Sequence, residues 1–178
     1  MPTDLAFEPA LSRPDLLAGP VAAALASLGL ADAVQAAPID PDLADTAEFC
    51  AAYGIDAAES ANCVVVAGKR GQTVTFAACV VLATTRADVN GLVRRRLDAR
   101  KVSFAAREDA VGATGMEFGG ITPLGLPADW PVLVDAAVAA APWVVIGSGL
   151  RRSKLALAGK TLATLPTAEV LDGLGLPA

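Results

Sequence analysis

The residues best suited to chemistry lie in one glycine- and proline-rich stretch, positions 114–127, which holds four glycines and two prolines. Glycine lets the backbone adopt conformations closed to other residues and lets a ligand approach closely, and proline fixes φ and removes a donor. Such a loop can hold bare backbone N–H groups rigid, where they stabilise negative charge that develops during a reaction. The alternative is a shaped turn between a helix and a strand.

Two polar residues near apolar strands are further candidates. Asp135 ends the apolar run 132–134, where a carboxylate either caps a helix or touches a substrate or water. Asn62 begins an apolar, β-branched run, and its amide can donate and accept hydrogen bonds but carries no charge. A purely structural role for Asn62 is the alternative.

The composition excludes several classes of site. The chain of 178 residues has no histidine, which removes Ser-His-Asp chemistry and the usual zinc sites. We expect neither a metal nor a cofactor. Cys50, Cys63 and Cys79 form no C-x-x-C pair, which favours reduced thiols in a cytoplasmic protein. The Gly147-Ser148-Gly149 segment lacks the rest of a dinucleotide fingerprint.

Charge limits the kinds of partner. Fourteen Lys and Arg against nineteen Asp and Glu give a net charge of −5, which argues against a protein that coats nucleic acid nonspecifically. Two basic clusters, 94–101 and 151–154, are either solvated surfaces or contacts to phosphates. The apolar stretch 136–150 is short and broken by Pro142 and Gly147, so we expect no membrane span.

The elements that must position these residues alternate between helices and strands. A helix is predicted from Asp45 or Thr46 to Tyr53, ended by Gly54. A hairpin is predicted from strands 62–67 and 73–82 around a turn at 68–71. A helix opening at 86–88, strand 101–104, helix 107–113, strands 132–134, 143–146 and near Leu155, and a final helix pair follow. This pattern indicates an α+β fold with a mixed sheet.

The order of residues in the central loop adds a resemblance. The string Gly119-Gly120-Ile121-Thr122-Pro123-Leu124-Gly125 resembles the signature of the YbaK family of aminoacyl-tRNA deacylases, which are related to the editing domain inserted in bacterial prolyl-tRNA synthetases. The similarity spans roughly residues 40–165. It implies a single-domain, curved, mostly antiparallel mixed sheet, partly closed as a barrel and flanked by helices. We expect residues 1–35 to form an N-terminal arm and helix, and 36–178 the editing domain.

The resemblance also implies a function and its residues. It implies a trans-editing hydrolase that cleaves the ester of a mischarged aminoacyl-tRNA at its terminal adenosine and releases a small amino acid. Gly119, Gly120, Asp135 and Asn62 are the expected catalytic residues. The expected substrate-binding residues are Ile121, Thr122, Pro123, Leu124, Gly125, Gly147 and Gly149. The family usually carries a lysine where this chain has Asn62.

The expected partners are the aminoacylated end of a tRNA and an aminoacyl-tRNA synthetase. An ester is already activated, so a chain without histidine can hydrolyse it by positioning water and the ribose hydroxyl. The neutral Asn62 and the acidic net charge support an alternative. In that alternative, the pocket binds an amino acid, a nucleoside or a partner protein without chemistry. The sequence leaves the oligomeric state open.

Overall fold

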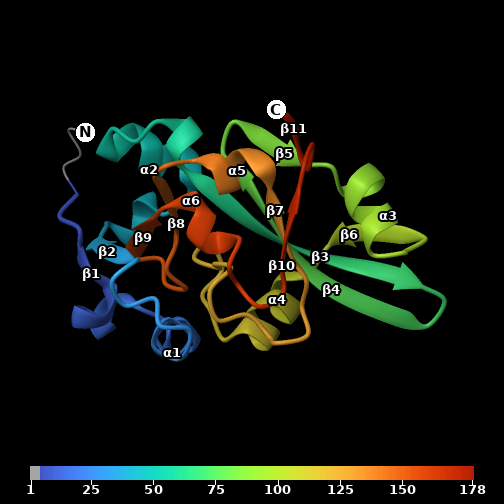
Figure 1. Cartoon of the computed structure of the whole chain (residues 1–178), viewed down its shortest axis with the longest axis horizontal. Helices are drawn as coiled ribbons and strands as arrows, with labels where there is room; N and C mark the ends of the chain where they lie inside the picture. The colour runs from blue at the N-terminus through green and yellow to red at the C-terminus, as the bar shows by residue number, and fades with distance from the viewer. Residues whose placement is uncertain (1–4) are drawn as a thin grey trace.

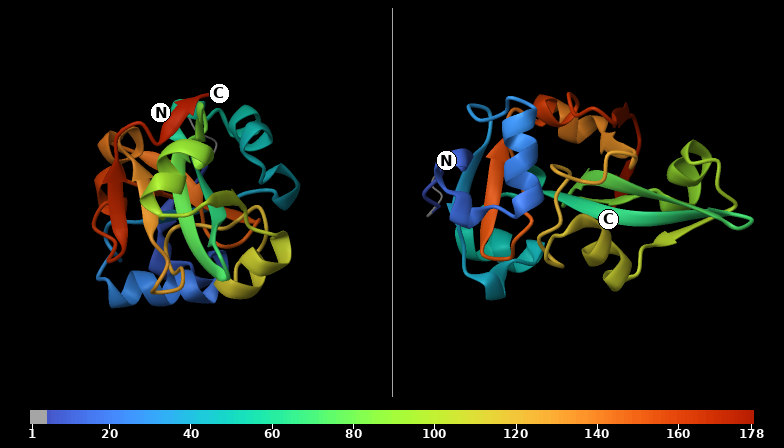
Figure 2. Two further views of the ribbon diagram at one scale, coloured as in Figure 1. Left: turned by 90° about the vertical axis from the view of Figure 1, so that its right-hand side faces the viewer. Right: turned by 90° about the horizontal axis from the view of Figure 1, so that it is seen from below.

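A long hairpin forms the centre of the fold. In the computed structural model, which describes residues 5–178, β3 (Ala61–Arg70) pairs antiparallel with β4 (Thr73–Leu82). The turn lies at Gly71, whose φ is 61°, and not over 68–71 as expected, because three further residue pairs extend the ladder to Arg70 and Thr73. Figure 1 and Figure 2 show the tip of this hairpin extending beyond the rest of the molecule.

The hairpin belongs to a five-stranded mixed sheet. Its strand order is β10-β7-β4-β3-β6, with β6 at Lys101–Phe104, β7 at Val132–Asp135 and β10 at Ala168–Leu171. The strand β7 runs parallel to both β4 and β10. The predicted final helix pair is wrong: only its first member, α6 (Gly159–Leu162), is helical, and the second is strand β10. Pro166 cannot continue a helix, and the apolar residues beyond it pair with β7 instead.

A second, four-stranded antiparallel sheet lies beside the first. Its order is β1 (Glu8–Pro9), β2 (Gln35–Pro38), β9 (Ser153–Leu157) and β8 (Val144–Gly147). A bridge between Ser60 and Val145 links the two sheets. β5 (Thr85–Ala87) and β11 (Gly175–Pro177) form a two-stranded ribbon. The α+β class is confirmed, although across residues 5–178 the sheets stay open and form no closed barrel.

Short helices cover the sheets. They are α1 (Gly19–Ser27), α2 (Thr46–Tyr53), α3 (Arg94–Arg96), α4 (Arg107–Thr114), α5 (Ala136–Ala140) and α6. As predicted, α2 ends at Gly54, which has a φ of 65°. Asp88 caps a π-type turn, Val89–Val93, by accepting hydrogen bonds from the backbone N–H groups of Gly91 and Leu92. Within residues 5–178, no helix has the length and apolar character to cross a membrane.

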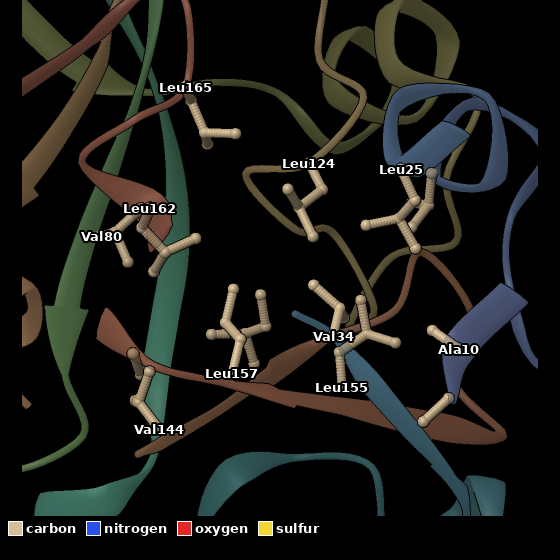
Figure 3. Packing of buried hydrophobic residues seen from close by; sticks show 14 of the residues in the cluster. Ala10, Leu25, Val34, Val80, Leu124, Val144, Leu155, Leu157, Leu162 and Leu165 are labelled. Atoms are coloured by element: carbon tan, nitrogen blue, oxygen red, sulfur yellow. The ribbon is translucent and has the colours of Figure 1, made fainter. Parts of the chain in front are cut away.

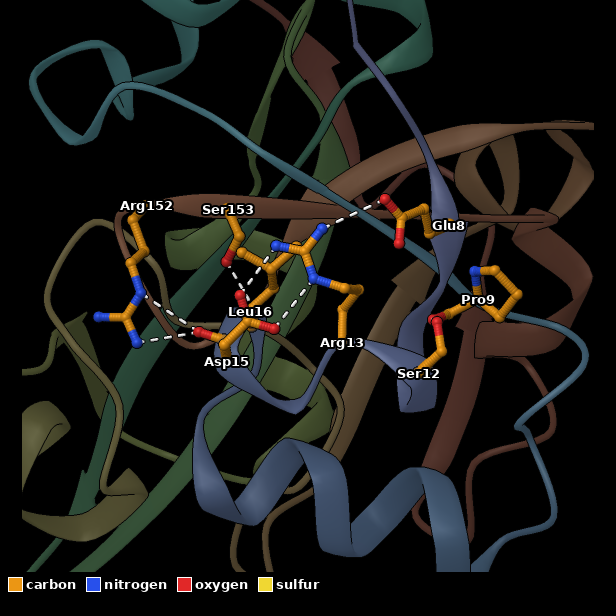
Figure 4. A network of polar contacts seen from close by, with 8 residues as sticks. All are labelled: Glu8, Pro9, Ser12, Arg13, Asp15, Leu16, Arg152 and Ser153. Atoms are coloured by element: carbon orange, nitrogen blue, oxygen red, sulfur yellow. Dashed lines mark hydrogen bonds and ion pairs between the residues drawn. The ribbon is translucent and has the colours of Figure 1, made fainter.

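The main core joins the N-terminal residues to both sheets. Figure 3 shows Leu25 and Val34 packed with Leu155 and Leu157 of β9. Hydrogen bonds fasten the same region from outside (Figure 4): the Arg152 guanidinium donates to the Asp15 carbonyl at 2.9 and 3.2 Å, and the Ser153 hydroxyl donates to the Leu16 carbonyl at 2.7 Å. Arg152 therefore makes a structural contact, whereas the sequence left a solvated surface or a phosphate contact open for this cluster.

We expect Gly159→Ala to destabilise the protein by about 1–3 kcal/mol or more, because overpacking a core costs about this much. A Cβ on Gly159 would collide with the Val138 carbonyl oxygen and lie 2.9 Å from the Ala141 carbonyl oxygen. Gly112→Ala is the matched control, since its Cβ meets nothing within 4 Å and alanine favours helix α4 by roughly 0.5–1 kcal/mol. Urea unfolding measures both. Equal free energies of unfolding for the two variants would contradict the close packing of Gly159 against α5.

Candidate functional site

A cavity of about 390 Å³ opens beside the glycine-rich loop. Strand β3 forms one wall through residues 61–65, and the start of α2 forms another through residues 44–46. The remaining lining residues come from five other segments: Phe104, Ala105, Ala110, Phe118, Gly119, Ile121, Gly147 and Lys154. The cavity thus gathers residues that are more than a hundred positions apart in the sequence, from Ala44 to Lys154. It is mostly apolar with a few polar groups, as ligand pockets usually are.

Gly119 is one of the glycine-rich loop residues that line this cavity. Its φ of 87° lies in the left-handed region, which an L-residue with a side chain rarely adopts. Arg151 fixes the loop from behind: its backbone N–H donates to Glu117 Oε1 at 2.9 Å, and its guanidinium donates to the carbonyls of Pro41 at 3.1 Å and Phe118 at 3.4 Å. The loop is therefore tied to the segment that leads into α2.

The next loop residues turn away from the cavity. The Gly120 N–H donates to the Glu117 carbonyl at 2.9 Å, and the Gly120 carbonyl accepts from the Gly149 N–H at 2.7 Å. Thr122 and Leu124 are fully buried, and Leu124 joins the main core. Of the predicted loop residues, the structure brings Gly119 and Ile121 to the cavity. It uses Gly120, Thr122, Pro123, Leu124 and Gly125 to shape the bend.

The backbone of the glycine-rich loop packs directly against Gly147. A Cβ at this position would lie 2.6 Å from the Gly120 carbonyl oxygen and 3.0 Å from that of Ile121. Because real Cβ contacts are essentially never this short, only glycine lets the loop lie against the end of β8. Gly149, also predicted, has a φ of 87° and packs against Ala18 and Val21, which places it behind the loop.

Asn62 lines the cavity, and it is paired with Thr46. The Thr46 hydroxyl donates to Asn62 Oδ1 at 2.5 Å, which leaves the Asn62 amide N–H₂ group to donate elsewhere. Asp135, in contrast, is buried at the end of β7 where α5 begins, and its carboxylate lies near Gly175 and Thr85. The structure does not bring Asp135 to this cavity.

Lys154 is the charged residue of the cavity wall that the sequence reasoning placed on the surface. Only 8% of it is exposed. Its ammonium group donates to the Ala44 carbonyl at 2.9 Å and lies 5.0 Å from the centre of the Phe49 ring. Burial lowers the pKa of Lys154 from 10.5 to about 8, while Cys50 and Asp45 raise it slightly. The alternation of β9 was the available signal, since Ser153, Leu155 and Leu157 face the main core.

Cys63 is the potential nucleophile of the wall. Burial, with a small contribution from Cys79, raises the pKa of its thiol far above the ordinary value. The thiolate, which is the reactive form, is therefore scarce at neutral pH. Covalent catalysis by Cys63 is disfavoured on this ground.

Two exposed aromatic rings frame the cavity. Phe104 is 68% exposed and Phe118 is 47% exposed, and the Arg107 guanidinium lies 4.6 Å from the centre of the Phe118 ring. A second cavity of about 560 Å³ shares Asn62, Val64 and Phe104 with the first. The two cavities therefore border the same residues of β3 and β6. Sequence reasoning missed both rings, because single phenylalanines give no pattern.

The buried lysine leads to a prediction about pH. Between about pH 8 and 10.5 the unfolded chain keeps a proton on Lys154 that the folded protein has lost. The contribution of Lys154 to the free energy of unfolding should therefore rise with pH in this window, by roughly 3 kcal/mol. The buried thiols of Cys63 and Cys79, whose pKa values are raised, contribute in the opposite direction. Lys154→Met should lack this rise, and Lys160→Met, on the exposed surface, should keep it. Urea unfolding at several pH values tests this, and equal slopes in both variants would contradict it.

Comparisons with known proteins agree with this geometry. A profile of the aminoacyl-tRNA editing domain matches residues 40–165. A crystal structure of a candidate trans-editing enzyme for prolyl-tRNA synthetase is similar in fold, with a TM-score of 0.74 and 23% identity over 87% of this chain and 94% of that one. The hypothetical protein APE2540 gives a TM-score of 0.66 at 22% identity, over 78% and 86% of the two chains.

A scaffold protein used for computational epitope grafting gives a TM-score of 0.74 at 22% identity, over 87% of this chain and 95% of that one. A search of curated proteins finds no match. The structural similarities, all below 25% identity, establish the fold. The profile covers well over half of the sequence and includes the glycine-rich loop, β3 and Lys154. On this evidence, the chain belongs to the aminoacyl-tRNA editing domain family.

Proposed function

We propose that this protein is a trans-editing hydrolase that deacylates mischarged aminoacyl-tRNA in the cytoplasm. The observation that carries the proposal is the cavity itself, because the stretch matched by the editing family places Gly119, Ile121 and Asn62 around one pocket. A volume of about 390 Å³ falls in the range of pockets for small ligands. It suits an esterified ribose with a small amino acid.

The proposed reaction is a simple ester hydrolysis. Water attacks the carbonyl carbon, and the carbonyl π electrons move to oxygen. The tetrahedral intermediate then collapses, and the bond to the ribose oxygen breaks. The ribose oxygen takes up the proton that the attacking water has given up, and the free amino acid leaves. The protein contributes by positioning water and the ester and by donors that stabilise the oxyanion. Backbone groups at Gly119 and Ile121 and the Asn62 amide border the cavity where these donors are needed.

The exposed rings give the tRNA end a place to bind. Bases stack on aromatic side chains with about 1–3 kcal/mol per base, independent of sequence. Phe104 borders both cavities, and Phe118 lies at the loop with Arg107 over its ring. We expect the terminal adenine to stack on one of these rings while the aminoacyl group enters the smaller cavity.

A non-catalytic binding module is the second candidate. The observation that favours it is the pairing of the Gly120 N–H with the Glu117 carbonyl, which removes one donor expected for the oxyanion. In that case the same cavity would bind an amino acid, a nucleoside or a partner protein and release it unchanged.

A panel of mischarged tRNAs separates the two candidates. The panel should begin with the tRNA for proline carrying a wrong amino acid, because one similar structure is a candidate trans-editing enzyme for prolyl-tRNA synthetase. It should include the correctly charged tRNAs as controls. Multiple turnovers on at least one mischarged tRNA, with the correctly charged form spared, are expected. Saturable binding of the tRNAs without release of amino acid would overturn the proposal in favour of the binding module.

A further inference from the structure

Lys154 occupies an unusual place for a charged residue. It lies in β9, the strand between β2 and β8 in the four-stranded sheet. Neighbouring side chains of a strand point to opposite faces, and Leu155 and Leu157 fill the main core. Lys154 therefore points to the other face, where it meets Ala44, the Phe49 ring and the cavity.

The buried charge has little compensation inside the protein. Within residues 5–178 no carboxylate lies within ion-pair distance of its ammonium group. The nearby titratable and charged groups are Asp45, Cys50 and Arg151, and the Asp45 carboxylate accepts from the Arg151 guanidinium at 3.4 Å. An ammonium group has three N–H donors, and the Ala44 carbonyl accepts one. A buried, unpaired charge is costly unless a ligand shares the cost.

The buried position of the Lys154 ammonium group determines which atom of the substrate it can contact. A tRNA phosphate is large and hydrated and stays at the mouth of a small cavity, whereas the acyl group must enter it. Lys154 lines the same cavity as Asn62 of β3. An oxygen that gains negative charge inside the cavity is therefore the group that Lys154 can stabilise.

We propose, on the basis of the deacylase function above, that Lys154 is the cationic donor of the site and hydrogen-bonds the acyl carbonyl oxygen of the bound ester as it becomes an oxyanion. Charge-assisted hydrogen bonds are stronger than neutral ones, so one ammonium donor can replace the Gly120 amide that the fold has used internally. The competing role is structural, because Ala44 ends the short helical turn Pro41–Leu43 and Lys154 caps it.

The test compares Lys154→Met, Lys154→Arg and the double variant Lys154→Met/Asn62→Lys with Lys160→Met as the control. Single-turnover deacylation of the mischarged tRNA identified by the panel is the first readout. Lys154→Met should lose about a hundredfold to a thousandfold in rate, as when one oxyanion donor is removed. Lys160→Met should match the wild type. The double variant returns an amine to the same cavity from β3. It should react at least about tenfold faster than Lys154→Met.

Two further readouts separate catalysis from support of the fold. Binding of a tRNA whose amino acid is joined by an uncleavable amide should change less than about threefold in Lys154→Met, since the oxyanion forms only in the transition state. The rate ratio of wild type to Lys154→Met should fall as the pH rises above 8, and the ratio for Lys154→Arg should not, because arginine stays protonated. A structural role would instead weaken binding and rate together at all pH values.

The outcomes are distinct. A wild-type enzyme that deacylates, together with a Lys154→Met variant that is equally fast, overturns the role of Lys154 and leaves the proposed function standing. A wild-type protein that turns over no substrate on the panel overturns the proposed function, and the role of Lys154 falls with it. Equal losses in rate and in binding of the amide analogue also overturn the proposal, in favour of the helical-turn cap.

Discussion

Gly147→Val is expected to lower the deacylation rate by about a hundredfold to a thousandfold, the range for removing one oxyanion donor, while the protein stays folded. The strand β8 itself tolerates the change, because β-branched residues favour strands. The glycine-rich loop does not, since a Cβ at this position would lie 2.6 Å from the Gly120 carbonyl oxygen. The loop must move, and Gly119 and Ile121 lose their place at the cavity.

The control is Gly19→Val, which adds the same side chain at the start of α1, where a Cβ meets nothing within 4 Å. Single-turnover deacylation gives the rate, and thermal unfolding reports whether each variant is folded. We expect Gly19→Val to react like the wild type. Full activity in a folded Gly147→Val variant would show that the loop position is irrelevant to the reaction, and the proposed geometry would have to be abandoned.

Composition predicted the loop but not the use of each residue in it. A stretch rich in glycine and proline indicates an unusual backbone, and the bend is where it was expected. Which N–H groups stay bare depends on partners far away in the sequence. The Gly120 carbonyl, for example, accepts from Gly149 in the loop that leads into β9, and no local pattern encodes that pairing.

The same limit applies to the charged residues. Lys154 follows two arginines and a serine, and such a run usually lies on the surface. Its burial results from the central position of β9 in the four-stranded sheet, which is a long-range arrangement. Asn62 was expected at the site because it stands where the family usually carries a lysine, not because of its local sequence pattern. Its partner Thr46, sixteen residues earlier, could not be predicted from spacing.

Secondary structure followed the sequence where local signals were strong. Gly54 ends α2, and the β-branched apolar runs on either side of the turn form β3 and β4, as expected. The C-terminal region failed because residues after Pro166 carry helix-compatible types but gain more by extending the sheet next to β7. Asp135 was expected near the substrate because the family resemblance implies a polar residue beside the pocket at this position. The end of β7 instead lies beside α5 and β11, away from the cavity.

Phe49→Ala is expected to destabilise the protein by about 3–5 kcal/mol, the usual cost of removing a buried phenyl ring. Phe49 is fully buried in a cluster with Ile39, Ile55 and Val145, and its ring centre lies 5.5 Å from that of Tyr53. The ring also supports the Lys154 ammonium group. Since a domain is stable by only about 5–15 kcal/mol, this single change removes a large share of its stability.

The matched control is Phe104→Ala, which deletes the same ring from a position that is 68% exposed. Exposed substitutions usually stay within about 0.5 kcal/mol, so urea unfolding should separate the two variants clearly. Phe104→Ala should instead weaken tRNA binding, because its ring borders both cavities. If both variants unfolded at the same urea concentration, α2 would not be held by this cluster. The position of Thr46 and the Ala44 carbonyl at the cavity would then need another cause.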